Sequence, residues 1–107
     1  MGYFDNAEHG YQFIVPAVYS GAQSGVEVLA AQPGKRIVID KIVFSRDEAG
    51  TMKLLSAATD VTNTFYFDSK GGAILDGLRL VCGVNEAVNI TTTGNGDHSL
   101  MLRYYTQ

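Results

Sequence analysis

Residues 30–44 read AAQPGKRIVIDKIVF, and the interpretation of this stretch decides the fold. A Pro33-Gly34 pair is followed by Lys35-Arg36 and then by a β-branched run. A phosphate-binding loop would need a run of glycines ending in Lys-Ser or Lys-Thr, and then a helix whose first amides hold the anion. This stretch has neither, whereas proline supplies the fixed φ and glycine the positive φ of a tight turn. The stretch is therefore predicted to be a corner that leads into a strand.

The strand that follows, residues 36–45, is apolar at both odd and even positions. Side chains of a strand alternate between its two faces, so a strand of this kind must cover apolar groups on both sides. We expect one face to lie in the core. The other face is expected to meet a second sheet or a neighbouring subunit. Alternatively, a bulge near Asp40-Lys41 accounts for apolar residues at both parities.

Elsewhere the dominant period is two. Leu100, Leu102 and Tyr104, for example, alternate with Met101 and Arg103, which places the two sets on opposite faces of a strand. Turn signals separate the alternating segments, among them Gly71-Gly72 and Gly94-Asn95-Gly96-Asp97. The predicted strands are, approximately, residues 12–18, 26–31, 36–45, 51–57, 61–67, 78–82, 86–92 and 98–105.

No window of the sequence supports a long amphipathic helix. About eight short strands at regular spacing within 107 residues indicate an all-β fold, an antiparallel β-sandwich with jelly-roll-like topology. The length allows one domain, assigned to residues 12–107, with residues 1–11 as an extended N-terminal arm.

Composition narrows the classes of partner. The formal net charge of −3 argues against a nucleic-acid groove, which needs clustered Lys and Arg. No apolar stretch approaches the length of a membrane span, and no secretory signal is seen. Cys82 is the single cysteine, so an internal disulfide is excluded, and the cytosol is a permissible place for the chain to fold. Because Cys82 shares parity with Leu78 and Leu80, it is predicted to be a small buried hydrophobe.

The sequence carries no enzyme signature. Asp97-His98-Ser99 contains the residue types of a hydrolytic triad, but neighbours on a strand face opposite ways and cannot relay a proton. Two histidines, His9 and His98, and one cysteine are too few for a zinc site unless scattered carboxylates join them. The 94–97 loop is too short to hold calcium and is predicted to be a hairpin turn. We therefore expect no catalytic residues, no metal and no cofactor.

The N-terminal segment, MGYFDNAEHGY, combines polar residues with three aromatics, Tyr3, Phe4 and Tyr11. Disordered segments have few aromatics, so this composition is unusual for a tail that simply remains exposed to solvent. Two interpretations remain open: a frayed chain end, or an arm in which Tyr3, Phe4 and Tyr11 bind a partner surface.

Several segments together resemble the small β-sandwich proteins that tailed bacteriophages place on their heads. They are the polar-aromatic leader, residues 31–36 (AQPGKR) opening a long strand, residues 70–77 (KGGAILDG), and residues 85–105 (NEAVNITTTGNGDHSLMLRYY). The resemblance to phage decoration (cement) proteins spans roughly residues 22–105. It rests on the composition of these segments and on their order along the chain. It implies a jelly-roll-like sandwich on the virion, at the capsid exterior, that binds the major capsid protein and stabilises the head. It carries no catalytic residues, and no capsid-anchoring motif is identified here.

The leading hypothesis is therefore a capsid decoration protein, made in the bacterial host cytoplasm and self-associating, with a trimer preferred because capsid lattices present threefold positions. The runner-up is a carbohydrate-binding or host-receptor module, since jelly rolls also serve as lectin folds. Such a module would stack sugars on exposed aromatics; the chain has no tryptophan, but Tyr19, Tyr66 and Tyr105 could substitute. A small enzyme is the third hypothesis, and it would need a pocket of convergent titratable groups.

Overall fold

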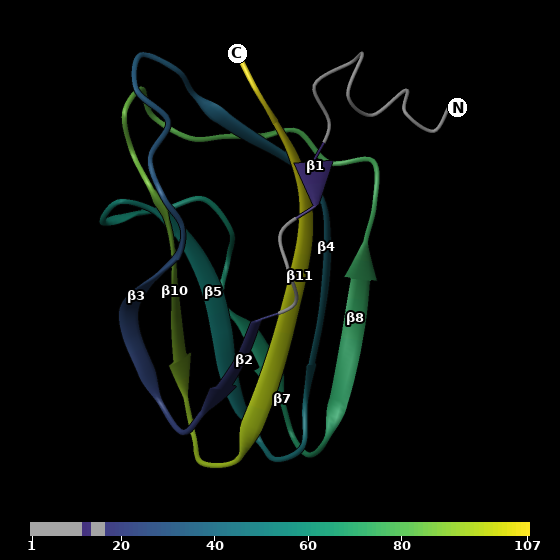
Figure 1. The fold of residues 1–107 in the computed structure, drawn as a ribbon. Coiled ribbons are helices and arrows are strands. Elements are labelled where there is room, and N and C mark those ends of the chain that lie inside the picture. The colour runs from purple at the N-terminus through teal and green to yellow at the C-terminus, as the bar shows by residue number, and fades with distance from the viewer. Residues whose placement is uncertain (1–11, 14–16) are drawn as a thin grey trace.

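The computed structural model describes residues 12–13 and 17–107, and every regular element within them is a β-strand (Figure 1). No helix among these residues is long and apolar enough to span a membrane. In chain order the strands are β1 (Gln12–Phe13), β2 (Ala17–Ser20), β3 (Gln23–Leu29), β4 (Ile37–Arg46), β5 (Gly50–Ser56), β6 (Thr59–Asp60), β7 (Phe65–Phe67), β8 (Gly71–Leu75), β9 (Leu80–Val81), β10 (Val88–Thr93) and β11 (Asp97–Thr106).

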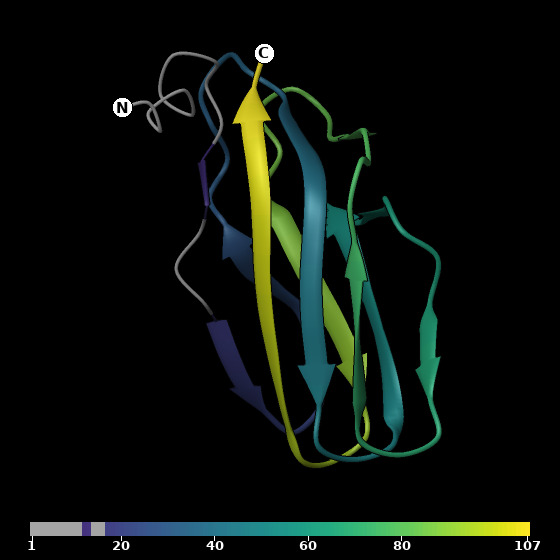
Figure 2. The same cartoon turned by 90° about the vertical axis from the view of Figure 1, so that its right-hand side faces the viewer.

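The strands form two antiparallel sheets that pack face to face, as the two views show (Figures 1 and 2). In sheet A, β11 and β4 are central, β1 and β2 pair with the far side of β11, and β8 and β9 pair with the far side of β4. In sheet B the order is β3-β10-β5, and β6 and β7 both pair with the far side of β5. The predicted antiparallel β-sandwich is therefore confirmed. Among the longer strands, the order is β2-β11-β4-β8 in sheet A and β3-β10-β5-β7 in sheet B, and the chain passes repeatedly from one sheet to the other.

A bulge explains why β4 is apolar at both parities. Lys41 pairs with Arg103, and Ile39 pairs with the next residue, Tyr104, so Asp40 is an extra residue in the ladder. The positions that point into the core are therefore odd-numbered on one side of the bulge and even-numbered on the other. Of the three explanations that the sequence left open, the bulge near Asp40-Lys41 is the one that the structure shows.

The core lies between β4, β5, β10 and β11. Its fully buried members include Ile90 of β10 and Leu100 and Leu102 of β11, as their alternation predicted. Phe44 of β4 contacts Phe65 and Phe67 of β7, with ring centroids 5.1 and 5.6 Å apart. These aromatic contacts fix the edge of sheet B against the centre of sheet A.

The turn at Pro33-Gly34 is confirmed. The amide of Lys35 donates to the carbonyl oxygen of Gln32 at 3.0 Å, and Gly34 has a φ of +72°. This is the geometry of a type II turn, in which the third residue must adopt positive φ. Gly94-Asn95-Gly96 is also a turn, but the predicted hairpin is wrong: β10 belongs to sheet B and β11 to sheet A, so this turn links the two sheets.

The edge strands depart from the prediction. Gly71-Gly72, expected to be a turn, begins β8, a strand that was not predicted from the sequence. The expected strand at 61–67 is shortened to β7, because the amides of Val61 and Thr62 both donate to the carbonyl of Leu54 and form a turn. The expected strand at 78–82 is reduced to the two residues of β9.

Candidate binding surfaces

A cleft of about 370 Å³ opens between the two sheets, on the side where β7 and β8 are the edges. Apolar side chains from both sheets line it: Val61, Phe65, Leu75, Leu78 and Leu80. Asp60, Thr62 and Asn63 supply its polar groups. Its volume and its mixture of apolar walls with a few polar groups are those of a small-ligand site.

The polar groups of the cleft are partly committed to the fold. Thr62 Oγ1 accepts the amide of Leu54 at 3.0 Å and donates to the carbonyl of Asn63 at 2.9 Å. Asp60 forms an ion pair with Lys53, with 3.1 Å between Oδ1 and Nζ. The carboxamide of Asn63 makes no hydrogen bond within the part of the chain that the structure describes, so it is the group best placed to meet a ligand.

Acid–base catalysis has little support in this cleft. Asp60 is the single titratable side chain among the described residues that line it, and Lys53 already neutralises its charge. General acid–base chemistry ordinarily uses two groups with different pKa values near the reacting atoms. The cleft can bind a molecule through its walls and Asn63, but it presents no such pair.

A second candidate surface is the outer face of sheet A, the face turned away from the core. Val43, Ile74 and Met101 lie side by side across β4, β8 and β11, because Val43 pairs with both of the others. We call these three residues the outer-face patch. Ile74 is 68% exposed, and a shallow depression of about 170 Å³ lies beside it, lined by Val43, Ser99, Leu100 and Met101.

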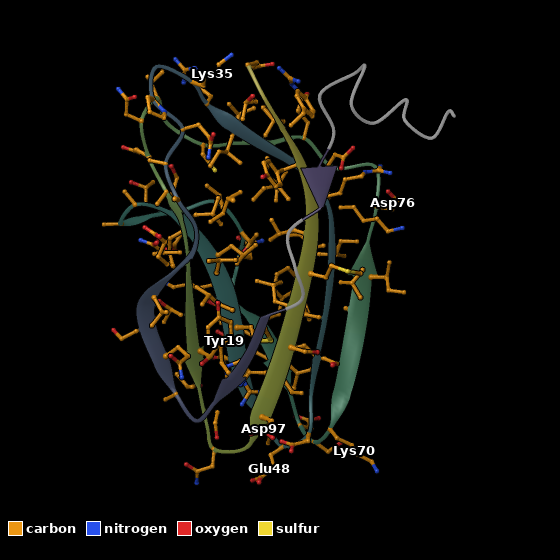
Figure 3. The ribbon with its side chains drawn as sticks, in the orientation of Figure 1. Tyr19, Lys35, Glu48, Lys70, Asp76 and Asp97 are labelled. Carbon is orange, nitrogen blue, oxygen red and sulfur yellow. The ribbon has the colours of Figure 1, made fainter. Side chains whose placement is uncertain are left out.

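Charged residues form the next row of this face. Arg103 Nε lies 2.8 Å from Asp40 Oδ1, the carboxylate that the bulge carries, and Arg103 Nη2 lies 3.7 Å from Asp76 Oδ1. Lys41 Nζ lies 3.9 Å from Asp76 Oδ2. Asp76 is at the end of β8, as Figure 3 shows. An exposed apolar patch beside a polar, charged row is the arrangement found at protein–protein interfaces.

A buried arginine holds the turns at one end of the sandwich. Arg46 is 4% exposed and donates to the carbonyl oxygens of Glu48, Ala49, Thr51, Thr93 and Asn95, at distances of 2.8 to 3.5 Å. Glu48 and Ala49 lie in the turn between β4 and β5, and Thr51 lies at the start of β5; Thr93 ends β10, and Asn95 lies in the turn that follows it. Figure 3 shows Glu48 and Asp97 together at this end. The guanidinium therefore ties the two turns together.

His98 is buried beside Arg46. It is 1% exposed, it pairs with Arg46 across β11 and β4, and its ring stacks on Tyr19 with centroids 5.8 Å apart. Neither ring nitrogen has a hydrogen-bond partner among the residues that the structure describes. Burial, and then the positive charge of Arg46, lower the pKa of His98; Asp97 and Asp47 oppose this shift. His98 points inward whereas its neighbours Asp97 and Ser99 lie outside the core, so these three residues form no triad.

Cys82 is buried, as predicted. Burial raises the pKa of its thiol, the hydrogen bond with Ser56 opposes that rise, and the charge of Glu86 adds to it. A thiol held neutral in this way is a poor nucleophile. The side chain acts as a small apolar group in the core.

The sequence-predicted partner residues Tyr3, Phe4 and Tyr11 lie outside the described residues, as does His9. The three tyrosines suggested for sugar stacking do not come together. Tyr66 is on β7 of sheet B and is 79% exposed, Tyr105 is on β11 of sheet A and accepts a hydrogen bond from Arg79, and Tyr19 stacks on buried His98. They offer no common stacking platform.

Neither the cleft nor the outer-face patch was identified from the sequence. The cleft joins residues from β6 through β9, and Asn63 carries no motif that would single it out. Ile74 could have been found, because it alternates with Ala73 and Leu75, but the preceding glycine pair was interpreted as a turn.

Comparisons with known proteins give no family for this chain. No protein-family model matches it, and no curated protein matches it. Among solved structures, it is similar to a chain described as "Bacillus endospore appendages form a novel family of disulfide-linked pili". The TM-score is 0.42 and the identity 14%, over 89% of this chain and 88% of that chain. Similarity at this level transfers no function.

Proposed function

We propose that this chain is a structural, non-catalytic protein of a bacteriophage virion that decorates the outer surface of the major capsid lattice and stabilises the head. The outer-face patch is the observation that carries the proposal. It is an apolar row on a β-sheet, formed by exposed Ile74 and half-buried Val43 and Met101, with the ion-pair row of Asp40, Lys41, Asp76 and Arg103 beside it. A flat surface of this kind fits another folded protein better than it fits a small substrate.

Self-association remains part of this proposal, with a trimer preferred at the threefold positions of a capsid. The apolar residues on both faces of residues 36–45 are one reason to expect an oligomer, but Val38 on the second face of β4 is already buried within one chain, which weakens that reason. The trimer now rests on lattice symmetry alone. Light scattering on the isolated protein at high micromolar concentration tests it, and a clean monomer would contradict it.

The test of capsid attachment uses a substitution in the outer-face patch. Met101→Lys places a charge in the patch without removing a fully buried side chain, because Met101 is partly exposed. We expect weaker co-sedimentation with purified heads of the parent phage. Tyr66→Lys is the matched control, since Tyr66 is exposed on the opposite sheet and should leave attachment unchanged. Full occupancy of the heads by Met101→Lys would refute the assignment of this face.

The cleft favours a second candidate function, a carbohydrate- or host-receptor-binding module of a virion. Its apolar walls and the carboxamide of Asn63 suit a sugar ring with its hydroxyl groups. A glycan array with hits that free sugar competes away, and that Asn63→Ala abolishes, would support this function. If no glycan binds, the cleft has no role in sugar recognition.

A further inference from the structure

Strand β8 is an open edge of sheet A. Its five residues pair with β4 in unbroken register, from Ile42 opposite Leu75 to Arg46 opposite Gly71, and no described strand pairs with its other side. Figure 2 shows β8 running along the border of the sheet. The backbone groups on that side are therefore available to another strand, and such a row is a template for pairing.

The edges of sheet B, β3 and β7, are protected in ways that β8 is not. β3 carries Glu27 and two register shifts against β10, which distort its edge. β7 has three residues, too few for an extended ladder. β8 has no charged residue and no proline between Gly71 and Leu75, and it exposes Ile74. Edge strands that must stay unpaired usually carry a lysine, a proline or a bulge.

The sequence around β8 is complementary to itself when reversed. Residues 70–76 read KGGAILD, so an antiparallel copy centred on Ala73 places Lys70 opposite Asp76. It also places Gly72 opposite Ile74 and Gly71 opposite Leu75, a small residue against a large one each time. Figure 3 shows Lys70 and Asp76 at opposite ends of the strand. We propose that β8 pairs antiparallel with β8 of a second copy about a twofold axis at Ala73, joining the two A sheets into one.

The contacts on the outer face support this register. Gly72 and Ile74 share that face with Ser45 and Val43, their partners on β4. A side chain at position 72 would meet the carbonyl oxygen of Phe44 at 2.6 Å, so glycine is required there by the chain's own packing. The absence of a side chain leaves space beside it, and Ile74 of the second copy fills that space. Each copy thereby removes its exposed isoleucine from water.

The charged ends add specificity. Lys70 has no ion-pair partner among the described residues, and Asp76 keeps an exposed carboxylate although it lies near Lys41 and Arg103. Opposite charges that face each other across an antiparallel pair stabilise it, and like charges destabilise it. The twofold axis forms the Lys70–Asp76 contact twice. Repulsion between like charges disfavours every register in which the two lysines or the two aspartates face each other.

This contact does not depend on capsid binding. It is twofold and closes at a dimer when it acts alone, whereas the trimer proposed above needs a different contact. The two are compatible on a lattice, because an icosahedral capsid has twofold positions between neighbouring threefold positions. The experiment therefore uses the isolated protein, and attachment to heads is measured separately.

The test is a charge exchange followed by sedimentation velocity at low ionic strength. Lys70→Asp alone and Asp76→Lys alone should each weaken dimerisation, by about tenfold, because two attractions become two repulsions. A mixture of the two variants should recover the dimer, since position 70 of each then meets the opposite charge at position 76 of the other. The double variant K70D/D76K should also dimerise. Thermal unfolding of each variant establishes that it is folded.

Ile74→Lys provides a second, independent perturbation, and it should abolish the dimer by placing a charge on the edge. Tyr66→Lys is its control, because that residue is also exposed and lies on β7 of the other sheet. A wild-type protein that stays monomeric at high micromolar concentration would overturn the proposal. A dimer that neither the charge reversals nor Ile74→Lys weakens would overturn it as well.

Discussion

Replacement of Arg46 tests how the ends of the two sheets are held together. Its guanidinium is 4% exposed and donates to five backbone carbonyl oxygens, with no carboxylate among its hydrogen-bond partners. The carbonyls of Glu48, Ala49 and Asn95 lie in turns, and those of Thr51 and Thr93 lie at the ends of β5 and β10 beside them. Arg46→Met keeps much of the side-chain volume but removes every donor.

The expected loss follows from these hydrogen bonds. The donors to Thr93, Glu48 and Thr51 are 2.8, 3.2 and 3.2 Å from their oxygens, and the other two are longer. A buried acceptor left without a donor costs about 1–3 kcal/mol, although water can reach some turn carbonyls after the change. We therefore expect Arg46→Met to lower the free energy of unfolding by about 3–5 kcal/mol. Arg46→Lys keeps the charge but loses the planar fork, so its loss should be smaller, about 1–3 kcal/mol.

Urea denaturation followed by fluorescence or circular dichroism measures the difference. The midpoint should fall while the slope with denaturant stays constant, because the amount of surface exposed on unfolding is unchanged. Arg79→Met is the matched control: this exposed arginine makes a single hydrogen bond to Tyr105, and its loss should be below about 1 kcal/mol. If Arg46→Met unfolds within about 1 kcal/mol of the wild type, water satisfies the carbonyls and the tie between the turns is unimportant.

Three further predictions concern other groups. His98 has a lower pKa in the folded chain than the ordinary value of about 6.5, so the unfolded state binds more protons as the pH falls below that value. The free energy of unfolding should then decrease, by up to about 1.4 kcal/mol per pH unit, until the pKa of the folded state is reached. His98→Phe should flatten this pH dependence when it is measured by urea denaturation at several pH values. An unchanged pH dependence in that variant would contradict the prediction. Cys82→Ser should destabilise the fold by about 1–3 kcal/mol without altering binding by the folded fraction, whereas rapid thiol labelling of the native protein would show that Cys82 is accessible. Removal of residues 1–10 should leave the melting temperature nearly unchanged but weaken co-sedimentation with phage heads; full occupancy would refute the arm, and a large fall in melting temperature would show that the segment belongs to the sandwich.

The central strands could be predicted because their alternation follows from burial. β10 and β11 have inward residues at every second position, and the turn between them has its glycines where the chain reverses. In β4 the same rule left a bulge near the polar pair Asp40-Lys41 as one of three explanations, and the structure has the bulge there. Each of these features depends on the types of neighbouring residues and on the burial of one face of a strand. Residue types and the alternation that burial imposes can both be read from a sequence.

The edges could not be predicted in the same way. An edge strand pairs on one side only, so a glycine pair is tolerated at the start of β8 although it resembles a turn. In the opposite direction, Val61 and Thr62 are good strand formers, yet they form a turn because Leu54 offers its carbonyl and amide to them. The cleft depends on both outcomes, since it lies between the edge of one sheet and the edge of the other.

The outer-face patch and the β8 edge are connected through the geometry of antiparallel pairing. A twofold axis that relates two antiparallel neighbours is perpendicular to the sheet, so both copies keep the same face on the same side. A dimer joined at β8 would present two patches on one continuous surface. In it, Ile74 lies at the contact between the two β8 strands, and Val43 and Met101 lie outside that contact. Two linked sites on a repeating lattice bind far more tightly than either site alone, by about 10² to 10⁴ when the spacing matches. A modest apolar patch would then be sufficient for stable attachment, and a monomeric edge variant would lose that avidity while its individual patch still bound.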